Sequence, residues 1–222
     1  VFIGDLGYYN DYNHTQPTPL NIAYVGGYLT QNVPEVRVKL FKNPLKLMEQ
    51  IKSAPPQILG LSHYQWNSNL NLKIVEAVKA ANPNTITVLG GPHFDSTSTE
   101  WMCSFFKKRP QIDFHIEREG ERTFTELMIA LLAADLKPDR LDTGDWPCTL
   151  FGYDHASGTL LHNPTGMHEQ LDLSTVPSPY LNGWMDEFLD DRYLAPIIET
   201  NRGCPYSCSF CAWGNATQSK IR

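Results

Sequence analysis

Three cysteines near the C-terminal end of the sequence have the type and spacing of metal ligands. Cys204, Cys208 and Cys211 follow the pattern C-x3-C-x2-C, with Gly203 and Pro205 beside the first of them. Three thiolates can hold three irons of a cubane cluster and leave the fourth iron open to another ligand. The same cysteines could instead hold zinc with a fourth ligand from elsewhere, or form a disulfide. No second C-x2-C pair and no paired histidine follows them, which favours the iron–sulfur interpretation.

The residues around these cysteines resemble the signature of the radical SAM enzymes. Thr-Asn-Arg-Gly precedes the motif at 200–203, and the aromatic Phe210 stands directly before the last cysteine. The resemblance implies that Cys204, Cys208 and Cys211 bind a 4Fe-4S cluster whose fourth iron is chelated by S-adenosylmethionine (SAM). It also implies that Phe210 lies beside the adenine of SAM, and that SAM is cleaved to a 5′-deoxyadenosyl radical.

Composition and charge restrict the class of protein. Of the five cysteines among 222 residues, only Cys103 and Cys148 lie outside the motif, which is poor material for a disulfide framework and suits a reducing cytoplasm. The net charge is −6 and no basic block is present, so we expect no nucleic-acid partner. No apolar run reaches the length of a membrane span and no export signal is visible, so we expect a cytoplasmic protein without a membrane partner.

The elements that must position the chemistry alternate between strands and helices along the first part of the chain. Short apolar runs predict strands at 1–6, 36–41, 57–62, 85–89 and 113–116. Apolar residues at helical spacing predict helices between them, the first opening at 17–19 with Thr18 as N-cap and Pro19 as its first residue. This alternation predicts an α/β fold with a parallel sheet and helices on both faces.

Ligands in such folds bind beyond the carboxyl ends of the strands. The residues that follow the predicted strands are polar or glycine-rich, and we predict that they bind a cofactor. They are Asp5, Leu6 and Gly7; Ser62, Tyr64, Trp66 and Asn67; Gly90, Gly91 and Pro92; and Glu117, Glu119, Gly120 and Glu121. No Gly-x-Gly-x-x-Gly follows the first strand, which argues against a dinucleotide.

The pattern changes between residues 139 and 193. Two strand-like segments, 149–153 and 159–162, flank a turn and predict a hairpin, and a proline-stiffened linker follows at 171–180. We therefore expect a first domain at 1–138, a linker with a β-hairpin at 139–193, and the start of a further domain at 194–222. The sequence ends eleven residues after Cys211, so we expect that last domain to be truncated.

The whole layout resembles one group, the radical SAM proteins that carry an N-terminal cobalamin-binding domain. The resemblance rests on four segments in order before the cysteines: Leu-Ser-x-Tyr-x-Trp-Asn at 61–67, Gly-Gly-Pro at 90–92, Glu-Gly-Glu at 119–121, and Leu-x-x-Val-Pro-Ser-Pro-Tyr at 173–180. It implies that 1–138 form a Rossmann-like (flavodoxin-like) cobalamin-binding domain, and that 194–222 begin a radical SAM partial TIM barrel.

The residue types suit a corrin, with two departures from known patterns. A glycine pair lets backbone approach a bulky ligand, Ser62 can donate a hydrogen bond to the nucleotide tail, and backbone N–H groups at 119–120 could bind the ring amides. The Asp-x-His-x-x-Gly motif of other cobalamin proteins is missing, so we expect no histidine below the cobalt and an aromatic surface of Tyr64 and Trp66 there instead. Within the resembled group, Arg118 stands where a glycine commonly precedes Glu-Gly-Glu.

The resemblance implies an enzyme, a cobalamin-dependent radical SAM methyltransferase. Such an enzyme methylates an unactivated carbon of a small molecule with methylcobalamin, after the 5′-deoxyadenosyl radical has removed a hydrogen. Its expected partners are the small-molecule substrate and an external electron donor of the flavodoxin or ferredoxin type. Two alternatives remain open. One is a non-methylating cobalamin-dependent radical SAM cyclase or rearrangement enzyme, and the other is a ligand-binding module with a structural metal site.

Overall fold

A seven-stranded sheet forms the centre of the molecule. The computed structural model describes residues 1–222 except 13–15, 168–169, 207, 209–220 and 222. The sheet has the strand order β3-β1-β4-β5-β6-β7-β8. Its five parallel strands are β1 (Phe2–Gly4), β3 (Lys39–Phe41), β4 (Ile58–Ser62), β5 (Ile86–Gly90) and β6 (Phe114–Ile116). These five follow the 2-1-3-4-5 order of flavodoxin-like sheets, which confirms the predicted α/β fold.

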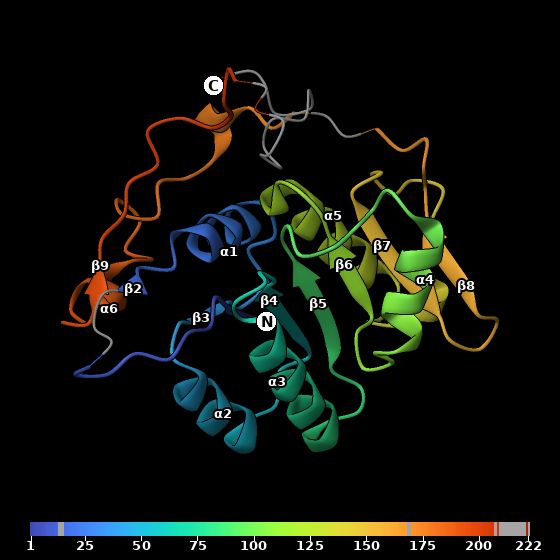
Figure 1. The fold of residues 1–222 in the computed structure, drawn as a ribbon, viewed down its shortest axis with the longest axis horizontal. Coiled ribbons are helices and arrows are strands. Elements are labelled where there is room, and N and C mark those ends of the chain that lie inside the picture. The colour runs from blue at the N-terminus through green and yellow to red at the C-terminus, as the bar shows by residue number, and fades with distance from the viewer. Residues whose placement is uncertain (13–15, 168–169, 207, 209–220, 222) are drawn as a thin grey trace.

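Helices cover both faces of the sheet. On one face lie α1 (Leu20–Asn32) and α5 (Gly120–Ala133), and on the other α2 (Pro44–Ser53), α3 (Ser68–Ala81) and α4 (Thr99–Lys107). Figure 1 shows α1 and α5 above the strands and α2 and α3 below them. The parallel strands are connected through these helices, because two parallel neighbours cannot be joined by a tight turn.

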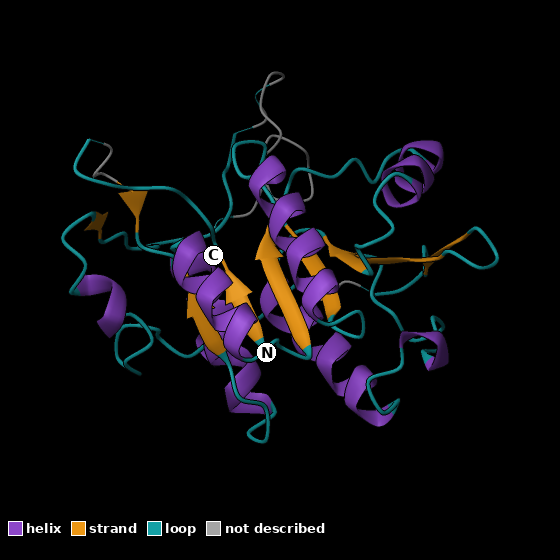
Figure 2. Ribbon diagram, turned by 90° about the horizontal axis from the view of Figure 1, so that it is seen from below, coloured by secondary structure: helices purple, strands orange, loops and turns teal. Residues whose placement is uncertain are grey.

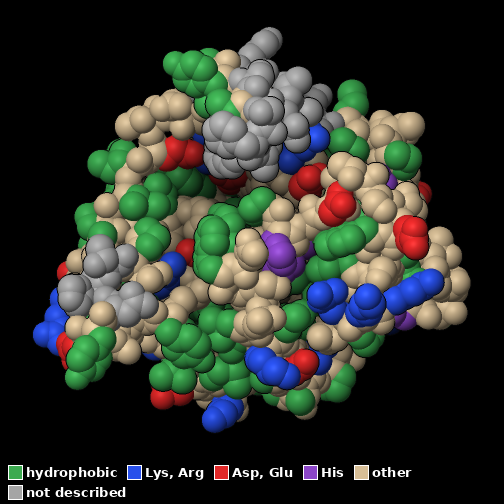
Figure 3. Space-filling model, in the orientation of Figure 1, with side chains coloured by type: hydrophobic (Ala, Val, Ile, Leu, Met, Phe, Trp, Pro, Cys, Tyr) green, Lys and Arg blue, Asp and Glu red, His purple; other side chains and the backbone are tan. Residues whose placement is uncertain are grey.

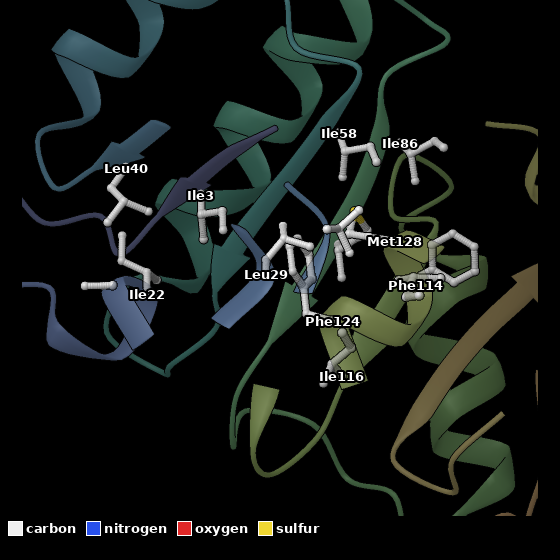
Figure 4. Close-up of a cluster of buried hydrophobic side chains, with 14 of the residues drawn as sticks. Ile3, Ile22, Leu29, Leu40, Ile58, Ile86, Phe114, Ile116, Phe124 and Met128 are labelled. Atoms are coloured by element: carbon white, nitrogen blue, oxygen red, sulfur yellow. The ribbon is translucent and has the colours of Figure 1, made fainter. Parts of the chain in front are cut away.

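The two faces carry separate hydrophobic cores. In the first, Ile3, Ile58 and Phe114 of the strands pack against Leu29 of α1 and Phe124 of α5, and each of the five is at most 4% exposed (Figure 4). The second core joins α2, α3 and α4 to the opposite face, with Phe106 fully buried. Burying one such side chain contributes about 1.5–3 kcal/mol, so these layers hold the strand ends in fixed positions.

The predicted hairpin is present and enlarges the sheet. Strands β7 (Leu150–Asp154) and β8 (Thr159–His162) pair with each other, and β7 also pairs antiparallel with β6. Gly152 lies opposite Phe114, and a Cβ on that glycine would stand 3.1 Å from the ring. The missing side chain lets the hairpin lie close to β6, and in Figure 2 the hairpin projects beyond the helices at this edge.

The structure corrects two predicted boundaries. Helix α1 begins at Leu20 with Pro19 at the N-cap position, so Thr18 is not the N-cap. The backbone N–H of Thr18 instead donates to Ala195 O at 2.9 Å, which holds Thr18 in extended chain. The strand predicted at 36–41 is β3, which spans only Lys39–Phe41. It is shorter because its parallel neighbour β1 offers only three residues for pairing.

Short elements precede and follow the hairpin, and the last of them leads the chain back to α1. They are the 3-10 helices η1 (Pro138–Arg140) and η2 (Leu173–Thr175), helix α6 (Asp186–Leu189) and strand β9 (Leu194–Ala195). Strand β9 pairs in parallel with β2 (Gln16–Pro17), just before α1. None of the helices in the described part of the chain has the length and apolar character of a membrane span. The face shown in Figure 3 mixes hydrophobic and charged side chains, with a row of Lys and Arg below α4.

Candidate functional site

The carboxyl ends of four parallel strands lie at one edge of the sheet. The register pairs Gly4 with Leu61, Ser62 with Gly90, and Gly90 with Ile116, so β1, β4, β5 and β6 end side by side. The switch point, where the strand order reverses, lies between β1 and β4. The loops that were predicted to bind a cofactor therefore meet at this edge.

A buried ion pair lies at the switch point. Lys42 Nζ lies 2.9 Å from Asp5 Oδ2, with the two side chains 5% and 13% exposed. The Ser62 hydroxyl donates to the other Asp5 oxygen. Ser62 is predicted to donate to a nucleotide tail, but its hydroxyl proton is directed at Asp5. In this arrangement Ser62 can only accept from a ligand. Leu6, the next residue along, packs into the second core, so only its backbone can face the edge.

Asparagine side chains fix the loop between β4 and α3. Asn67 accepts from Tyr64 N at 2.9 Å and donates to Ser62 O at 3.1 Å, while Asn71 donates to the same carbonyl at 2.7 Å. Both asparagines are at most 2% exposed. The Asn67 amide is thus engaged within the loop, and its predicted contact with a cofactor stays a prediction. Its observed effect is to hold Tyr64 and Ser62 in place.

The same loop presents an aromatic surface. The rings of Tyr64 and Trp66 stack at 4.5 Å with an interplanar angle of 7°, and Trp66 is 79% exposed. Burial, followed by the charge of Asp5, raises the pKa of Tyr64, so its hydroxyl stays neutral at physiological pH. This stacked pair matches the aromatic surface that the sequence predicted, and its position relative to cobalt stays a prediction.

The glycines after β5 differ in why they must be glycine. Gly91 has φ of 137°, and a Cβ there would lie 2.7 Å from His63 O. A Cβ on Gly90 would meet nothing closer than Ile116 O at 3.8 Å. The fold itself therefore tolerates a methyl group at Gly90, so a glycine there is free to serve the close approach of a ligand. Gly7 lies on the other side of the switch point, where its N–H donates to Lys42 O at 3.2 Å, and Pro92 is exposed.

A histidine pair lies beneath the edge. His63 Nδ1 lies 3.4 Å from His115 Nε2, and His63 Nε2 lies 3.1 Å from Ser68 Oγ. Burial, then the charges of His93 and Arg109, lowers the pKa of His63 to about 4, and burial also lowers the pKa of His115. Both rings are neutral at physiological pH. His115 is fully buried in β6, with no partner for Nδ1 among the described residues.

The loop between β6 and α5 contacts the segment that carries the cysteines. Arg118 adopts φ of 64°, the left-handed conformation that a glycine would take easily, and Glu117 N donates to Thr149 O at 2.9 Å. Arg202 lies 2.5 Å from Glu121 and 3.4 Å from Glu119. The carboxylates of Glu119 and Glu121 are thus engaged by Arg202, and the backbone N–H groups at the start of α5 remain the atoms suited to a cofactor.

Arg202 stays charged in this partly closed environment. Burial acts to lower its pKa, but the neighbouring carboxylates of Glu121 and Glu199 outweigh burial and raise the pKa. This arginine belongs to the Thr-Asn-Arg-Gly stretch, whose sequence alone predicts no role for its side chain. Its partners Glu121 and Glu119 lie 81 and 83 residues earlier in the chain, so no local pattern could reveal these two contacts.

Two of the three predicted cluster ligands lie among the described residues. Cys204 is partly buried, Cys208 is exposed, and both are free thiols. Cys211 and Phe210 lie outside the described residues, so their predicted roles stay predictions. Within the described ranges no group of three histidine, cysteine or acidic side chains is arranged to hold a metal. The two free thiols are the donor type that an iron–sulfur cluster requires.

Comparisons with known proteins point to one cofactor. The family model described as the B12 binding domain matches residues 14–128. The 2-(S-pantetheinyl)-carbapenam-3-carboxylate methyltransferase of Streptantibioticus cattleyicolor is 35% identical over 194 residues, covering 82% of this chain and 26% of that protein. The cobalamin-dependent radical SAM methyltransferase TokK of Streptomyces tokunonensis is 34% identical over 215 residues, covering 92% of this chain and 30% of TokK.

More distant matches agree on the fold and widen the range of reactions. An anaerobic magnesium-protoporphyrin IX monomethyl ester cyclase of Rubrivivax gelatinosus is 26% identical over 200 residues, covering 87% of this chain and 34% of the cyclase. The solved structure of the cobalamin-dependent S-adenosylmethionine radical enzyme OxsB with aqua-cobalamin bound is 23% identical with a TM-score of 0.62, covering 95% of this chain and 28% of OxsB. The chain thus spans about a third or less of these relatives.

Proposed function

The chain belongs to the B12-binding domain family, and from this premise we propose that it forms the cobalamin-binding part of a radical SAM methyltransferase acting on a small molecule. One observation carries the proposal. Arg202, two residues before Cys204, forms ion pairs with Glu119 and Glu121 at the sheet edge where a corrin would bind. The beginning of the cysteine motif and the predicted cobalamin site therefore lie at one end of the fold. Two methyltransferase relatives at 34–35% identity support the same reading.

The residues of this chain divide into those that bind cobalamin and those that begin a cluster site. The lack of a side chain at Gly90 lets the ligand approach closely, the stacked Tyr64 and Trp66 provide an apolar surface, and Ser62 offers an acceptor at the switch point. Cys204 and Cys208, together with Cys211, supply three thiolates. When bound, cobalamin would supply the methyl group, and the cluster with SAM would supply the 5′-deoxyadenosyl radical. An electron donor of the flavodoxin or ferredoxin type would reduce the cluster.

Product analysis tests the reaction class. The complete protein, reconstituted anaerobically with iron, sulfide and cobalamin, is given a reductant, candidate small-molecule substrates, and SAM with a deuterated methyl group. Methylation requires one SAM for the radical and one for the methyl group, so 5′-deoxyadenosine and S-adenosylhomocysteine should form together, with label on the product carbon. Formation of 5′-deoxyadenosine without S-adenosylhomocysteine would favour the cyclase alternative, for which the Rubrivivax relative is the specific observation.

Cofactor analysis tests the binding assignments. Iron and sulfide should decrease to background in a variant with Cys204, Cys208 and Cys211 all changed to Ala, because the three thiolates are the cluster ligands. The electron paramagnetic resonance spectrum of bound cob(II)alamin should show no nitrogen superhyperfine splitting, since we expect the dimethylbenzimidazole to be detached from the cobalt and no histidine to replace it. Stoichiometric zinc with no bound cobalamin would overturn the proposal in favour of a binding module with a structural metal.

A further inference from the structure

The structure points to Arg202 as a positioning residue that couples the cysteine segment to the cobalamin-binding edge. We propose that this arginine makes cobalamin binding and cluster binding energetically dependent on each other. The inference rests on the function proposed above and goes further, because it assigns the connection between the two cofactors to one side chain. Arg202 contacts neither cofactor in this proposal and acts through the loop that it holds.

Four contacts to three carboxylates surround the guanidinium group. Arg202 Nη2 lies 2.5 Å from Glu121 Oε1, and Nη1 lies 3.4 Å from Glu119 Oε1. Its Nε lies 3.0 Å from each carboxylate oxygen of Glu199, and its Cζ lies 5.3 Å from the centre of the Tyr24 ring. The planar fork of an arginine directs its N–H donors at several carboxylates in fixed geometry, whereas a lysine offers a single point charge. We call this group the Arg202 clamp.

The clamp joins the segment that leads to Cys204 directly to the start of α5. Glu119 is the N-cap residue of α5 and Glu121 lies in its first turn, directly after the end of β6. Glu199 and Arg202 lie in the segment that leads from β9 to Cys204, and Tyr24 lies on α1. Figure 1 shows this segment passing above α1 toward the same end of the molecule as the start of α5. The position of Cys204 is thus fixed relative to the β6–α5 loop.

Because the clamp is buried, losing either the guanidinium of Arg202 or the carboxylate of Glu121 should destabilise it. The side chains of Arg202 and Glu121 are 13% and 6% exposed. A buried carboxylate that loses its counter-ion is strongly destabilised, so the β6–α5 loop must rearrange when Arg202 is neutralised. The same loop carries the backbone N–H groups predicted to bind the corrin amides. Cluster binding holds the cysteine segment in place and, through the clamp, favours the form of the loop that binds cobalamin. By linkage, cobalamin binding favours cluster binding to the same extent.

A thermodynamic cycle tests the coupling without relying on turnover. The cobalamin dissociation constant of the complete protein is measured by absorbance titration, with and without the reconstituted cluster. Coupling of this kind typically changes affinity about 5- to 150-fold, so we expect the cluster to tighten cobalamin binding by at least about fivefold. In Arg202→Gln the two dissociation constants should agree within about twofold. Arg202→Lys should keep part of the coupling, because it keeps the charge without the fork.

A matched control separates the clamp from surface charge in general. Arg192 precedes β9 in the sequence, whereas Arg202 follows it. Arg192 pairs with Asp11 at 2.8 Å, but both of these side chains are more than 70% exposed. Arg192→Gln should therefore keep the full coupling. If Arg202→Gln fails to fold, the double variant Glu121→Gln/Arg202→Gln removes both charges, leaves no unpaired charge in this pair, and should show the same loss of coupling.

The outcomes distinguish this inference from the proposed function. Full coupling in the Arg202 variants, or no coupling in the unaltered protein with both cofactors bound, overturns the role of the clamp and leaves the proposed function standing. Absence of cobalamin binding in the unaltered protein overturns the proposed function itself.

Discussion

Replacing Gly90 and Gly91, at the end of β5, by alanine one at a time should separate an effect on folding stability from an effect on cobalamin affinity. Gly91 has φ of 137°, a backbone conformation that costs a non-glycine residue roughly 1–3 kcal/mol. An alanine Cβ would also lie 2.7 Å from His63 O, which accepts from His93 N at 3.2 Å. Moving that carbonyl would weaken a hydrogen bond worth about 1 kcal/mol. Gly91→Ala should therefore cost about 3 kcal/mol of folding free energy.

Gly90→Ala is the matched control within the same turn. Its Cβ would lie no closer than 3.8 Å to Ile116 O, and replacing a glycine where no strain arises stabilises a protein by about 0.4–1 kcal/mol. We expect its stability to equal or slightly exceed that of the unaltered chain. Its cobalamin affinity should nevertheless decrease by about tenfold or more, because the methyl group occupies the space above the strand end.

Urea unfolding followed by circular dichroism measures the first effect, and absorbance titration with cobalamin measures the second. With an m-value of about 3 kcal/mol/M, a loss of 3 kcal/mol lowers the urea midpoint by about 1 M. Gly91→Ala with an unchanged midpoint would refute the backbone argument. Gly90→Ala with undiminished cobalamin affinity would refute the argument that this glycine serves the ligand.

Three further predictions concern the residues around the edge. Lys42→Met should cost about 3 kcal/mol in urea unfolding because it leaves the carboxylate of Asp5 buried without its cation, and adding Asp5→Asn should recover part of that loss; a double variant less stable than the single one would contradict this. The pKa of His63 is about 4 in the folded protein against 6.5 in the unfolded chain, so the unfolded state binds more protons between these values. Stability should therefore decrease by roughly 3 kcal/mol as the pH falls from 6.5 to 4, and His63→Gln should flatten that part of the unfolding profile. Asn43→Ala removes a side-chain cap that accepts from Leu45 N and Lys46 N, and should lower the urea midpoint by the equivalent of about 1 kcal/mol.

The order of strands and helices could be predicted because each depends on a local pattern. The apolar run before Ser62 and the helical spacing of Ile74 and Val78 act within a few residues, and the structure contains both elements. Element ends depend on distant partners instead. Thr18 was predicted as an N-cap, but a backbone bond to Ala195 holds it in extended chain, and nothing near Thr18 in the sequence indicates this partner.

In the candidate site, too, features set by local sequence could be predicted and features set by distant partners could not. The loops could be located, because parallel strands must end at one edge and the sequence shows where each strand ends. The pairing of side chains within those loops could not be predicted. Lys42 reaches Asp5 across 37 positions and Arg202 reaches Glu121 across 81, and neither basic residue differs in local context from an exposed one. The hydrogen bond from Ser62 to Asp5 is equally hidden, because the two residues are 57 positions apart in the sequence.

The pairing of β2 with β9 has a consequence for the order in which the chain folds. Gln16 and Leu194 meet across almost the whole length of the chain, and so do Thr18 and Ala195. Contacts between residues so far apart in sequence form late, because the entropy lost on closing the long loop between them opposes their formation. The central sheet and its helices therefore assemble first, and the segment from Leu194 to Cys204 docks onto a finished surface. Its amide hydrogens should exchange with solvent faster than those of β4 and β5, and the cysteines would remain accessible for cluster assembly after the rest of the domain has folded.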